Sequence, residues 1–157
     1  MLEFKTPQIE DKAWVDQCFK HLKTMNCDYT FGNMFVWSTE YSTKICRFKD
    51  FFICSWGMGK EKNFGMPVGK GDFKEAVEEV IKYAKANDIM PRFYGVTEAY
   101  VEMLNENFPD AFQFLYDESY GDYIYEVEKM ASLKGKKYHG KRNHITNFKK
   151  NNPNWSF

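Results

Sequence analysis

The sequence has 157 residues, enough for one domain with a hydrophobic core, and 22 basic side chains balance 22 acidic ones. Apolar residues make up 43% and aromatic residues 18% of the chain, which favours a packed, strand-containing fold over a disordered one. No run approaches the roughly 20 apolar residues of a membrane helix, and the N-terminus lacks a signal-peptide pattern. We therefore expect a cytoplasmic protein without a transmembrane segment.

Two helices and a hairpin are predicted in the first part of the chain. Thr6 and Pro7, followed by acidic residues, are typical of a helix start, and apolar residues then recur every three or four positions. A second short helix is predicted around residues 31–37. Two β-rich runs, 43–48 and 51–55, are separated by two residues, a spacing that predicts a β-hairpin.

The middle of the chain alternates between strand and helix patterns. A short strand is expected around 64–68, and the clearest helix, 73–87, begins after Gly71-Asp72. A strand at 91–96, a helix at 97–107 capped by Thr97, and strands at 111–116 and 122–127 follow. This order predicts an α+β fold in which helices flank a mixed, mostly antiparallel sheet.

The end of the chain is strongly basic. Residues 131–157 contain no acid and seven basic side chains, whereas residues 1–130 carry 15 basic and 22 acidic side chains, a net of −7. Such a division predicts an anionic partner for the tail: nucleic acid, phosphate or an acidic protein surface. The basic side chains fall mostly within a predicted helix at 136–150; they are Lys134, Lys136, Lys137, Lys141, Arg142, Lys149 and Lys150.

Metal and cofactor sites are not predicted. The four cysteines show no CxxC spacing and are interpreted as reduced thiols. His139 and His144 are five positions apart, which does not match the spacing of a helical metal pair, and His21 is expected at the surface near a helix end. The segment from Lys137 to Arg142 matches a coenzyme A pyrophosphate loop poorly, so no cofactor is expected.

Two blocks of sequence resemble a known family. The first is the segment 29–35, YTFGNMF, with Trp37; the second comprises DYIY at 122–125, MASLKGKK at 130–137 and KRNHI at 141–145, followed by Phe148, Pro153 and Trp155. Together they resemble bacterial uncharacterised proteins related to the C-terminal domain of phosphatidylglycerol lysyltransferase. The resemblance implies two tandem domains of the acetyltransferase-like (GNAT) fold and an aminoacyl-tRNA donor.

Family members run to about twice this length, so the chain resembles their N-terminal half. The resemblance implies a first acetyltransferase-like domain at 1–130, and a basic linking helix with the start of a missing second domain at 131–157. The apolar ending at Trp155 and Phe157 likewise predicts that the sequence is a piece of a longer protein. Catalytic residues of the lysyltransferases lie mainly in the second half, so none is assigned and the chain by itself is expected to be inactive.

Two sets of binding residues are predicted, each with an alternative. Lys137, Lys141 and His144 would share one face of a helix, and Arg142 and Lys149 another; these five could follow a tRNA backbone or form a solvated helix docked on the acidic body. Phe31, Asn33 and Trp37 could line an acceptor pocket or pack in the core.

Three functions remain open from the sequence. The first is half of an aminoacyl- or acyltransferase. The second is a non-enzymatic interaction module whose basic helix binds nucleic acid or a partner domain. The third is self-association through an exposed apolar surface, which would give a homo-oligomer.

Overall fold

The computed structural model describes the chain except for residues 21, 23, 119, 120, 122 and 157. The expected surface position of His21 and the start of the strand predicted at 122–127 lie outside the described residues. The chain divides into two compact units, Met1–Tyr116 and Asp117–Phe157. The predicted domain boundary after residue 130 stays a prediction.

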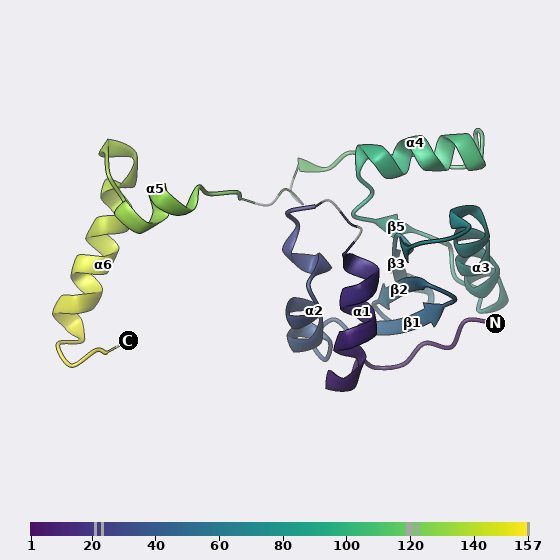
Figure 1. Cartoon of the computed structure of the whole chain (residues 1–157), viewed down its shortest axis with the longest axis horizontal. Helices are drawn as coiled ribbons and strands as arrows, with labels where there is room; N and C mark the ends of the chain where they lie inside the picture. Colours follow the sequence, from purple (N-terminus) through teal and green to yellow (C-terminus); the bar gives the residue numbers. More distant parts are fainter. Residues whose placement is uncertain (21, 23, 119–120, 122, 157) are drawn as a thin grey trace. The chain divides into compact units, whose positions relative to one another are not determined.

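The first unit contains four α-helices and five strands in the part of the chain that the structure describes (Figure 1). Short 3-10 helices at Ile9–Asp11, Cys27–Tyr29 and Gly59–Glu61 join them. The bounds are α1 Lys12–Phe19, α2 Phe31–Trp37, β1 Lys44–Phe48, β2 Phe51–Trp56, β3 Asn63–Gly65, β4 Val68–Gly69, α3 Phe73–Ala86, β5 Phe93–Tyr94 and α4 Glu98–Asn107.

The sheet is mostly antiparallel, with strand order β1-β2-β3-β5 and β4 also paired to β2. The predicted hairpin is confirmed: β1 and β2 pair antiparallel from Lys44 opposite Ser55 to Phe48 opposite Phe51, with a two-residue turn at Lys49-Asp50. Among the described strands, β3 and β5 alone pair in parallel. The architecture is therefore α+β, with helices on a mostly antiparallel sheet, as the sequence predicts.

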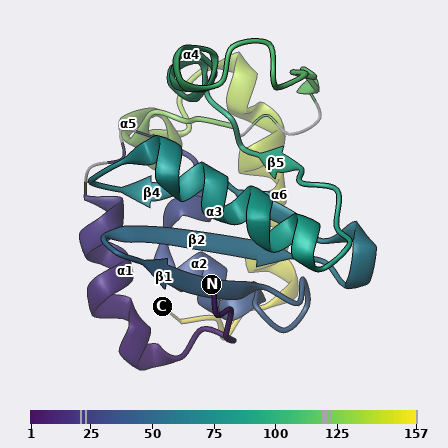
Figure 2. The same ribbon diagram turned by 90° about the vertical axis from the view of Figure 1, so that its right-hand side faces the viewer.

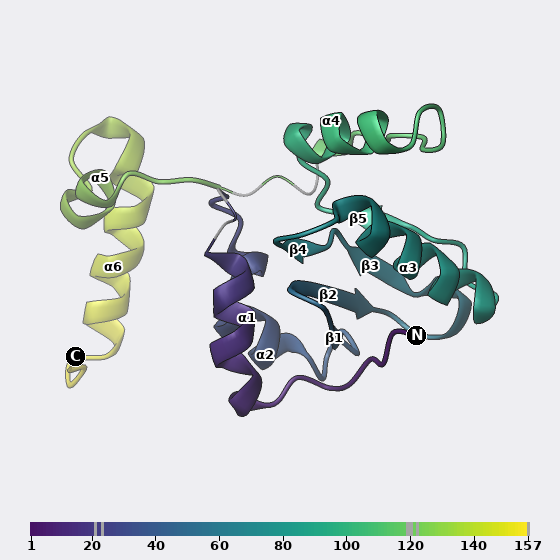
Figure 3. The same cartoon turned by 45° about the vertical axis from the view of Figure 1, so that its right-hand side comes forward.

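Helices cover the two faces of this sheet. Figures 2 and 3 show α3 on one side and α1 and α2 on the other. Alternate residues of β2 serve the two cores: Ile53 packs with Val80 of α3, whereas Phe52 packs with Val15 of α1 and Phe31 of α2. Burying a side chain such as Phe52, which is 1% exposed, contributes about 1.5–3 kcal/mol.

Local signals set the starts of the helices. The Asp72 side chain accepts a hydrogen bond of 3.0 Å from the Glu75 amide and caps α3, as expected of an N-cap residue. Thr30 caps α2 through the amide of Asn33. Thr97 occupies the N-cap position of α4, but its side chain makes no capping hydrogen bond.

Three predicted strands differ from the structure. The strand expected around 64–68 is two strands, β3 and β4, separated by Met66 and Pro67, because proline has no amide to donate to a ladder. The strands expected at 111–116 and 122–127 are wrong: the described residues 111–116 and 123–126 form no strand, and Val127 begins a helix. Alternating aromatic residues favour an extended backbone, but a strand also requires a partner edge.

The second unit consists of α5 Val127–Ser132, a 3-10 helix Lys136–Tyr138 and α6 His139–Asn151. The helix predicted at 136–150 therefore begins with a 3-10 turn, and α5 was not predicted. The connection bends where Leu133 takes a left-handed conformation, with φ of 48°, and Gly135 follows with φ of 96°. Leu133 and Tyr138 are the buried side chains among the described residues of this unit.

Candidate anion-binding site

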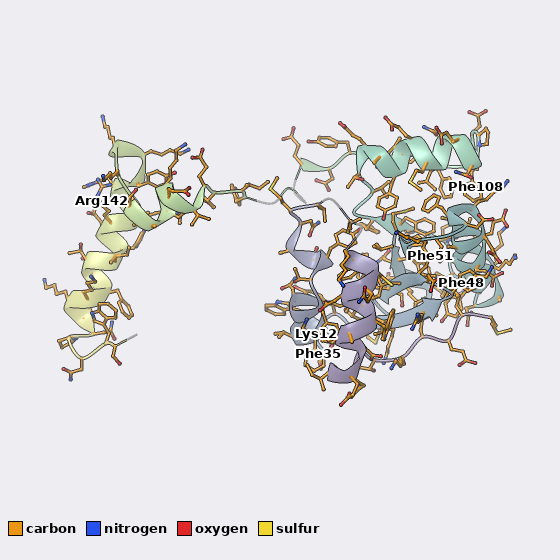
Figure 4. The ribbon with its side chains drawn as sticks, in the orientation of Figure 1. Lys12, Phe35, Phe48, Phe51, Phe108 and Arg142 are labelled. Carbon is orange, nitrogen blue, oxygen red and sulfur yellow. The ribbon has the colours of Figure 1, made fainter. Side chains whose placement is uncertain are left out.

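The turn between α5 and α6 is held by one arginine. Nη1 of Arg142, in the first turns of α6, donates a hydrogen bond to the carbonyl oxygen of Leu133 and another of 2.9 Å to that of Gly135. Figure 4 shows Arg142 at this turn. Carbonyls at a helix C-terminus have no partner within the helix, so the guanidinium satisfies acceptors that α5 cannot. Arg142 therefore fixes how α5 and α6 meet.

A shallow hollow lies beside this turn. Its lining residues include three lysines and three tyrosines, two of the tyrosines being well exposed. Glu126, which also lines it, forms an ion pair of 2.5 Å with Lys129. The lysines and tyrosines are Tyr123, Tyr125, Lys129, Lys134, Lys137 and Tyr138.

A second hollow lies toward the end of α6. His144, Ile145, Phe148 and Lys149 line it together with Trp155 and Ser156 of the following segment. The Lys149 ammonium lies 5.1 Å from the centre of the Trp155 ring, and the Phe148 and Trp155 rings meet edge to face at 6.3 Å. A cation beside an exposed ring suits nucleic acid, because the ring can stack on a base while the cation neutralises a phosphate.

The five predicted anion-binding residues have three different environments. Lys137 lines the first hollow, and Lys141 places its ammonium 5.2 Å above the Tyr125 ring. His144 and Lys149 line the second hollow. The Arg142 guanidinium already donates hydrogen bonds to two backbone carbonyls, so it stabilises the turn between α5 and α6. The helix thus presents two cationic surfaces. That these residues bind an anion stays a prediction.

The three predicted pocket residues also differ in environment. Phe31 is 3% exposed and stacks on Phe35 at 5.5 Å within the core. The Asn33 side chain donates a hydrogen bond of 3.0 Å to the Asp28 carboxylate beside the start of α2. Trp37 is 49% exposed and lies 5.9 Å from the ring of Tyr41. An acceptor pocket formed by these residues stays a prediction.

Two aromatic partners of the lysines were missed in the sequence. Tyr125 belongs to a segment that was predicted as a strand, and Trp155 follows the helix, so helical spacing connects neither with Lys141 or Lys149. The density of aromatic residues on both sides of the basic run was the available signal. The role of Arg142 carried no such signal, because its partners are backbone atoms.

Buried thiol and phenol groups of the first unit are held neutral. Burial raises the pKa of the Cys54 thiol to about 12, and burial also raises that of the Tyr100 hydroxyl to about 12. Burial likewise raises the pKa of Tyr29, with Cys54 and Tyr100 adding to the effect. Since a thiolate is the nucleophilic form of cysteine, Cys54 is not poised for nucleophilic chemistry at neutral pH.

Metal-binding clusters are absent from the described part of the chain: no three His, Cys, Asp or Glu side chains there gather closely enough to hold a metal ion. None of the helices in the described ranges combines the length and apolar character needed to cross a bilayer.

Comparison with protein families shows which family the chain matches. The family model for the C-terminal region of phosphatidylglycerol lysyltransferase matches residues 19–156. The chain belongs to this family. Comparison with curated proteins found no match. The family membership therefore stands on a match that includes α2, the whole sheet and the basic helix α6.

A solved structure adds a likeness over the whole chain. A crystal structure of a conserved protein of unknown function from Bacteroides thetaiotaomicron is 32% identical and superposes with a TM-score of 0.81. The match covers 99% of this chain and 53% of that one. This member of the lysyltransferase C-terminal family thus spans about half the length of the solved relative.

Proposed function

We propose that the chain is the N-terminal half of an aminoacyl- or acyltransferase with the acetyltransferase-like (GNAT) fold. Membership of the lysyltransferase C-terminal family supports this proposal, as does the mostly antiparallel sheet between helices. In this proposal the second unit guides an anionic donor, of which aminoacyl-tRNA is the best chemical fit. Such a donor would place the protein in the cytoplasm.

One observation carries the proposal: a cationic surface with aromatic rings beside its lysines. Residues 131–157 carry seven basic side chains and no acid, and the ammonium groups of Lys141 and Lys149 lie over the rings of Tyr125 and Trp155. Lysines follow a phosphate backbone, and exposed rings stack unpaired bases, so the two together favour nucleic acid over a simple anion.

The reaction of the whole enzyme would be acyl transfer from an ester. An amine or hydroxyl of the acceptor forms a bond to the acyl carbon while the ester bond to the ribose oxygen of the donor breaks. The acceptor's proton leaves with a general base and returns to the ribose oxygen. Positioning of donor and acceptor supplies the rest. No residue of this chain is assigned as that base, and we expect no turnover from the chain by itself.

Fluorescence anisotropy with labelled tRNA tests the proposal directly. Aminoacylated and bare tRNA are titrated with the purified chain at about 50 and 200 mM salt, a range over which phosphate contacts weaken steeply. Binding that falls with salt and favours aminoacylated tRNA supports the proposal. Absence of binding at the lower salt concentration refutes a role for the basic unit in donor binding.

Charge reversal supplies a matched control. The triple change Lys137→Glu, Lys141→Glu and Lys149→Glu should abolish binding while Arg142 still holds the turn. The control reverses three exposed lysines of the first unit and should leave binding intact. These control positions are Lys20, Lys70 and Lys85.

A second candidate function is a non-enzymatic interaction module. Exposed apolar side chains support this function: Ile145 and Phe148 of α6 are 45% and 53% exposed, and they lie between lysines of the same helix. A partner domain with an acidic, apolar face would fit this helix. The charge-reversed chain would then lose its partner or its stability with no change in RNA binding.

A further inference from the structure

One side of α6 carries lysines and apolar side chains together. At 3.6 residues per turn, five residues of this helix fall within an arc of about 140°, and we call this side the ring face. Lys150 lies on the opposite side of the helix. The residues of the ring face are Lys141, His144, Ile145, Phe148 and Lys149.

An aromatic ring lies beside each of the two lysines of the ring face. The Lys141 ammonium is 5.2 Å from the centre of the Tyr125 ring, and the Lys149 ammonium is 5.1 Å from that of Trp155. Tyr125 precedes α5 and Trp155 follows α6, so the two rings reach the helix from different segments. They are 46% and 43% exposed, and therefore both keep surface on which a further flat group can stack.

The two pairs of cation and ring are spaced along the helix. Lys141 and Lys149 are eight residues apart, which is about 12 Å along a helix that rises about 1.5 Å per residue. Stacked nucleotides of one strand are about 3.4 Å apart, so this distance spans about three to four of them. Phe148, whose ring meets that of Trp155 edge to face at 6.3 Å, adds apolar surface at one end. The ring face therefore matches a short stretch of one strand better than a single phosphate.

Rings beside the lysines favour an unpaired strand over a double helix. In a duplex the bases cover one another's faces, so lysines can contact phosphates but rings find no base on which to stack. In an unpaired strand the rings stack on bases while the lysines contact the phosphates between them. Among the described residues that line the second hollow, none is acidic, so nothing in that lining repels a phosphate.

We propose that the ring face binds an unpaired RNA strand of about three to four nucleotides. One base stacks on Tyr125 and another on Trp155, and the intervening phosphates contact Lys141 and Lys149. This inference rests on the proposed function and names the part of the donor that α6 contacts. The acceptor end of a tRNA, which carries the aminoacyl ester, is an unpaired strand of this kind, whereas the stems are double-helical.

Short labelled RNAs test the ring face without aminoacylation. Fluorescence anisotropy compares an unpaired RNA of about 8 nucleotides with a blunt duplex of the same sequence at about 50 mM salt. The duplex carries twice as many phosphates, so charge alone would favour it. We expect the unpaired RNA to bind at least about fivefold more tightly and to quench the fluorescence of Trp155. Equal or tighter binding of the duplex overturns the proposal.

Removing rings at constant charge separates stacking from electrostatics. Tyr125→Leu and Trp155→Leu should each weaken binding of the unpaired RNA about 5- to 100-fold and leave the slope of log affinity against log salt unchanged. Trp155→Phe keeps a ring and should retain most of the affinity. The control Tyr41→Leu changes a 57% exposed ring of the first unit and should bind as the wild type does. Wild-type affinity in both variants that lose a ring at α6 overturns the proposal.

The same titrations separate this inference from the proposed function. If tRNA binds with a steep salt dependence but Tyr125→Leu and Trp155→Leu bind it unchanged, the ring face proposal fails and the donor role stands. If unpaired RNA binds through the rings but aminoacylated tRNA is not favoured over bare tRNA, the donor role fails and the ring face proposal stands. Absence of binding to every RNA at the lower salt concentration overturns both.

Discussion

The guanidinium of Arg142 lies 2.9 Å from the carbonyl oxygen of Gly135, and the same nitrogen donates to Leu133. A single side chain thereby closes the connection between α5 and α6 in a unit with only two buried side chains among its described residues, Leu133 and Tyr138. Because this unit buries so few apolar side chains, hydrogen bonds of this kind contribute a large share of its stability.

Replacing Arg142 should loosen the second unit. Arg142→Gln removes the charge-assisted bonds to two carbonyls and should destabilise the α5–α6 arrangement by about 1–3 kcal/mol. Amide hydrogen exchange along α6 measures the effect, and exchange should accelerate about tenfold or more. Lys136→Gln, which removes an exposed charge from the adjoining 3-10 turn, is the control. Equal exchange in the two variants would contradict a structural role for Arg142.

Single lysine substitutions should distinguish lysines that contact phosphate from lysines that do not. Lys137→Ala and Lys149→Ala remove one cation from each hollow, and each should lower the slope of log affinity against log salt by about 0.7–0.9. Titrations of labelled tRNA at four or more salt concentrations give that slope. Lys20→Ala, on the first unit, should leave the slope unchanged. If Lys137→Ala leaves the salt slope unchanged, the first hollow does not contact the RNA.

Glycine at position 69 should be irreplaceable in the sheet. A Cβ atom there would lie 2.1 Å from the Asp50 carbonyl oxygen and 2.8 Å from the Phe51 Cα, both of them backbone atoms. Gly69→Ala should therefore cost about 3 kcal/mol in the free energy of unfolding. Gly32 in α2 has open space around its Cβ position, so Gly32→Ala should stabilise the protein by about 0.5–1 kcal/mol. Urea denaturation of both variants checks the opposite signs.

Asp11 should make stability fall in acid. Burial by itself raises its pKa, but hydrogen bonds from Lys5, Trp14 and the Gln8 amide outweigh burial and lower it. A carboxyl group with a lowered pKa in the folded state contributes stability above its unfolded pKa of about 4. That contribution is lost as pH falls through the lower folded value.

The variant Asp11→Asn tests this acid dependence. It should cost about 1–3 kcal/mol at pH 7 and progressively less as the pH falls below the unfolded pKa of about 4, because the wild-type protein then loses the contribution of the charged carboxyl. Urea denaturation at pH 7, 5 and 3 gives the difference. A constant difference between wild type and variant across the three pH values would show that the charge of Asp11 does not contribute.

Sequence patterns predicted the elements whose signals are local. The β1–β2 hairpin followed from two β-rich runs around Lys49-Asp50, and α3 from its start after Gly71-Asp72 and a helical spacing of apolar residues, most of which the structure buries. The division of the strand at Pro67 could also have been read from its missing amide. The helix α5 lacked a clear apolar stripe, and its C-terminus depends on Arg142, ten positions after it ends.

The features that sequence could not supply are pairings between distant residues. Residues 111–116 have the composition of a strand, yet whether they form one depends on a partner edge that composition does not encode. The candidate site shows the same limit: the basic residues were visible, but their assignment to two hollows follows from where Tyr125 and Trp155 place their rings.

The parallel pairing of β3 with β5 sets an order of assembly. β1 and β2 meet across two residues, whereas Phe64 meets Phe93 only after the chain has passed through β4 and all of α3. Closing the longer loop costs more chain entropy before any contact repays it, so pairings of this kind form late. During synthesis, the hairpin and α3 can therefore reach their native packing first. The strand β5, which ends the strand order of the sheet, is then the last one to join it.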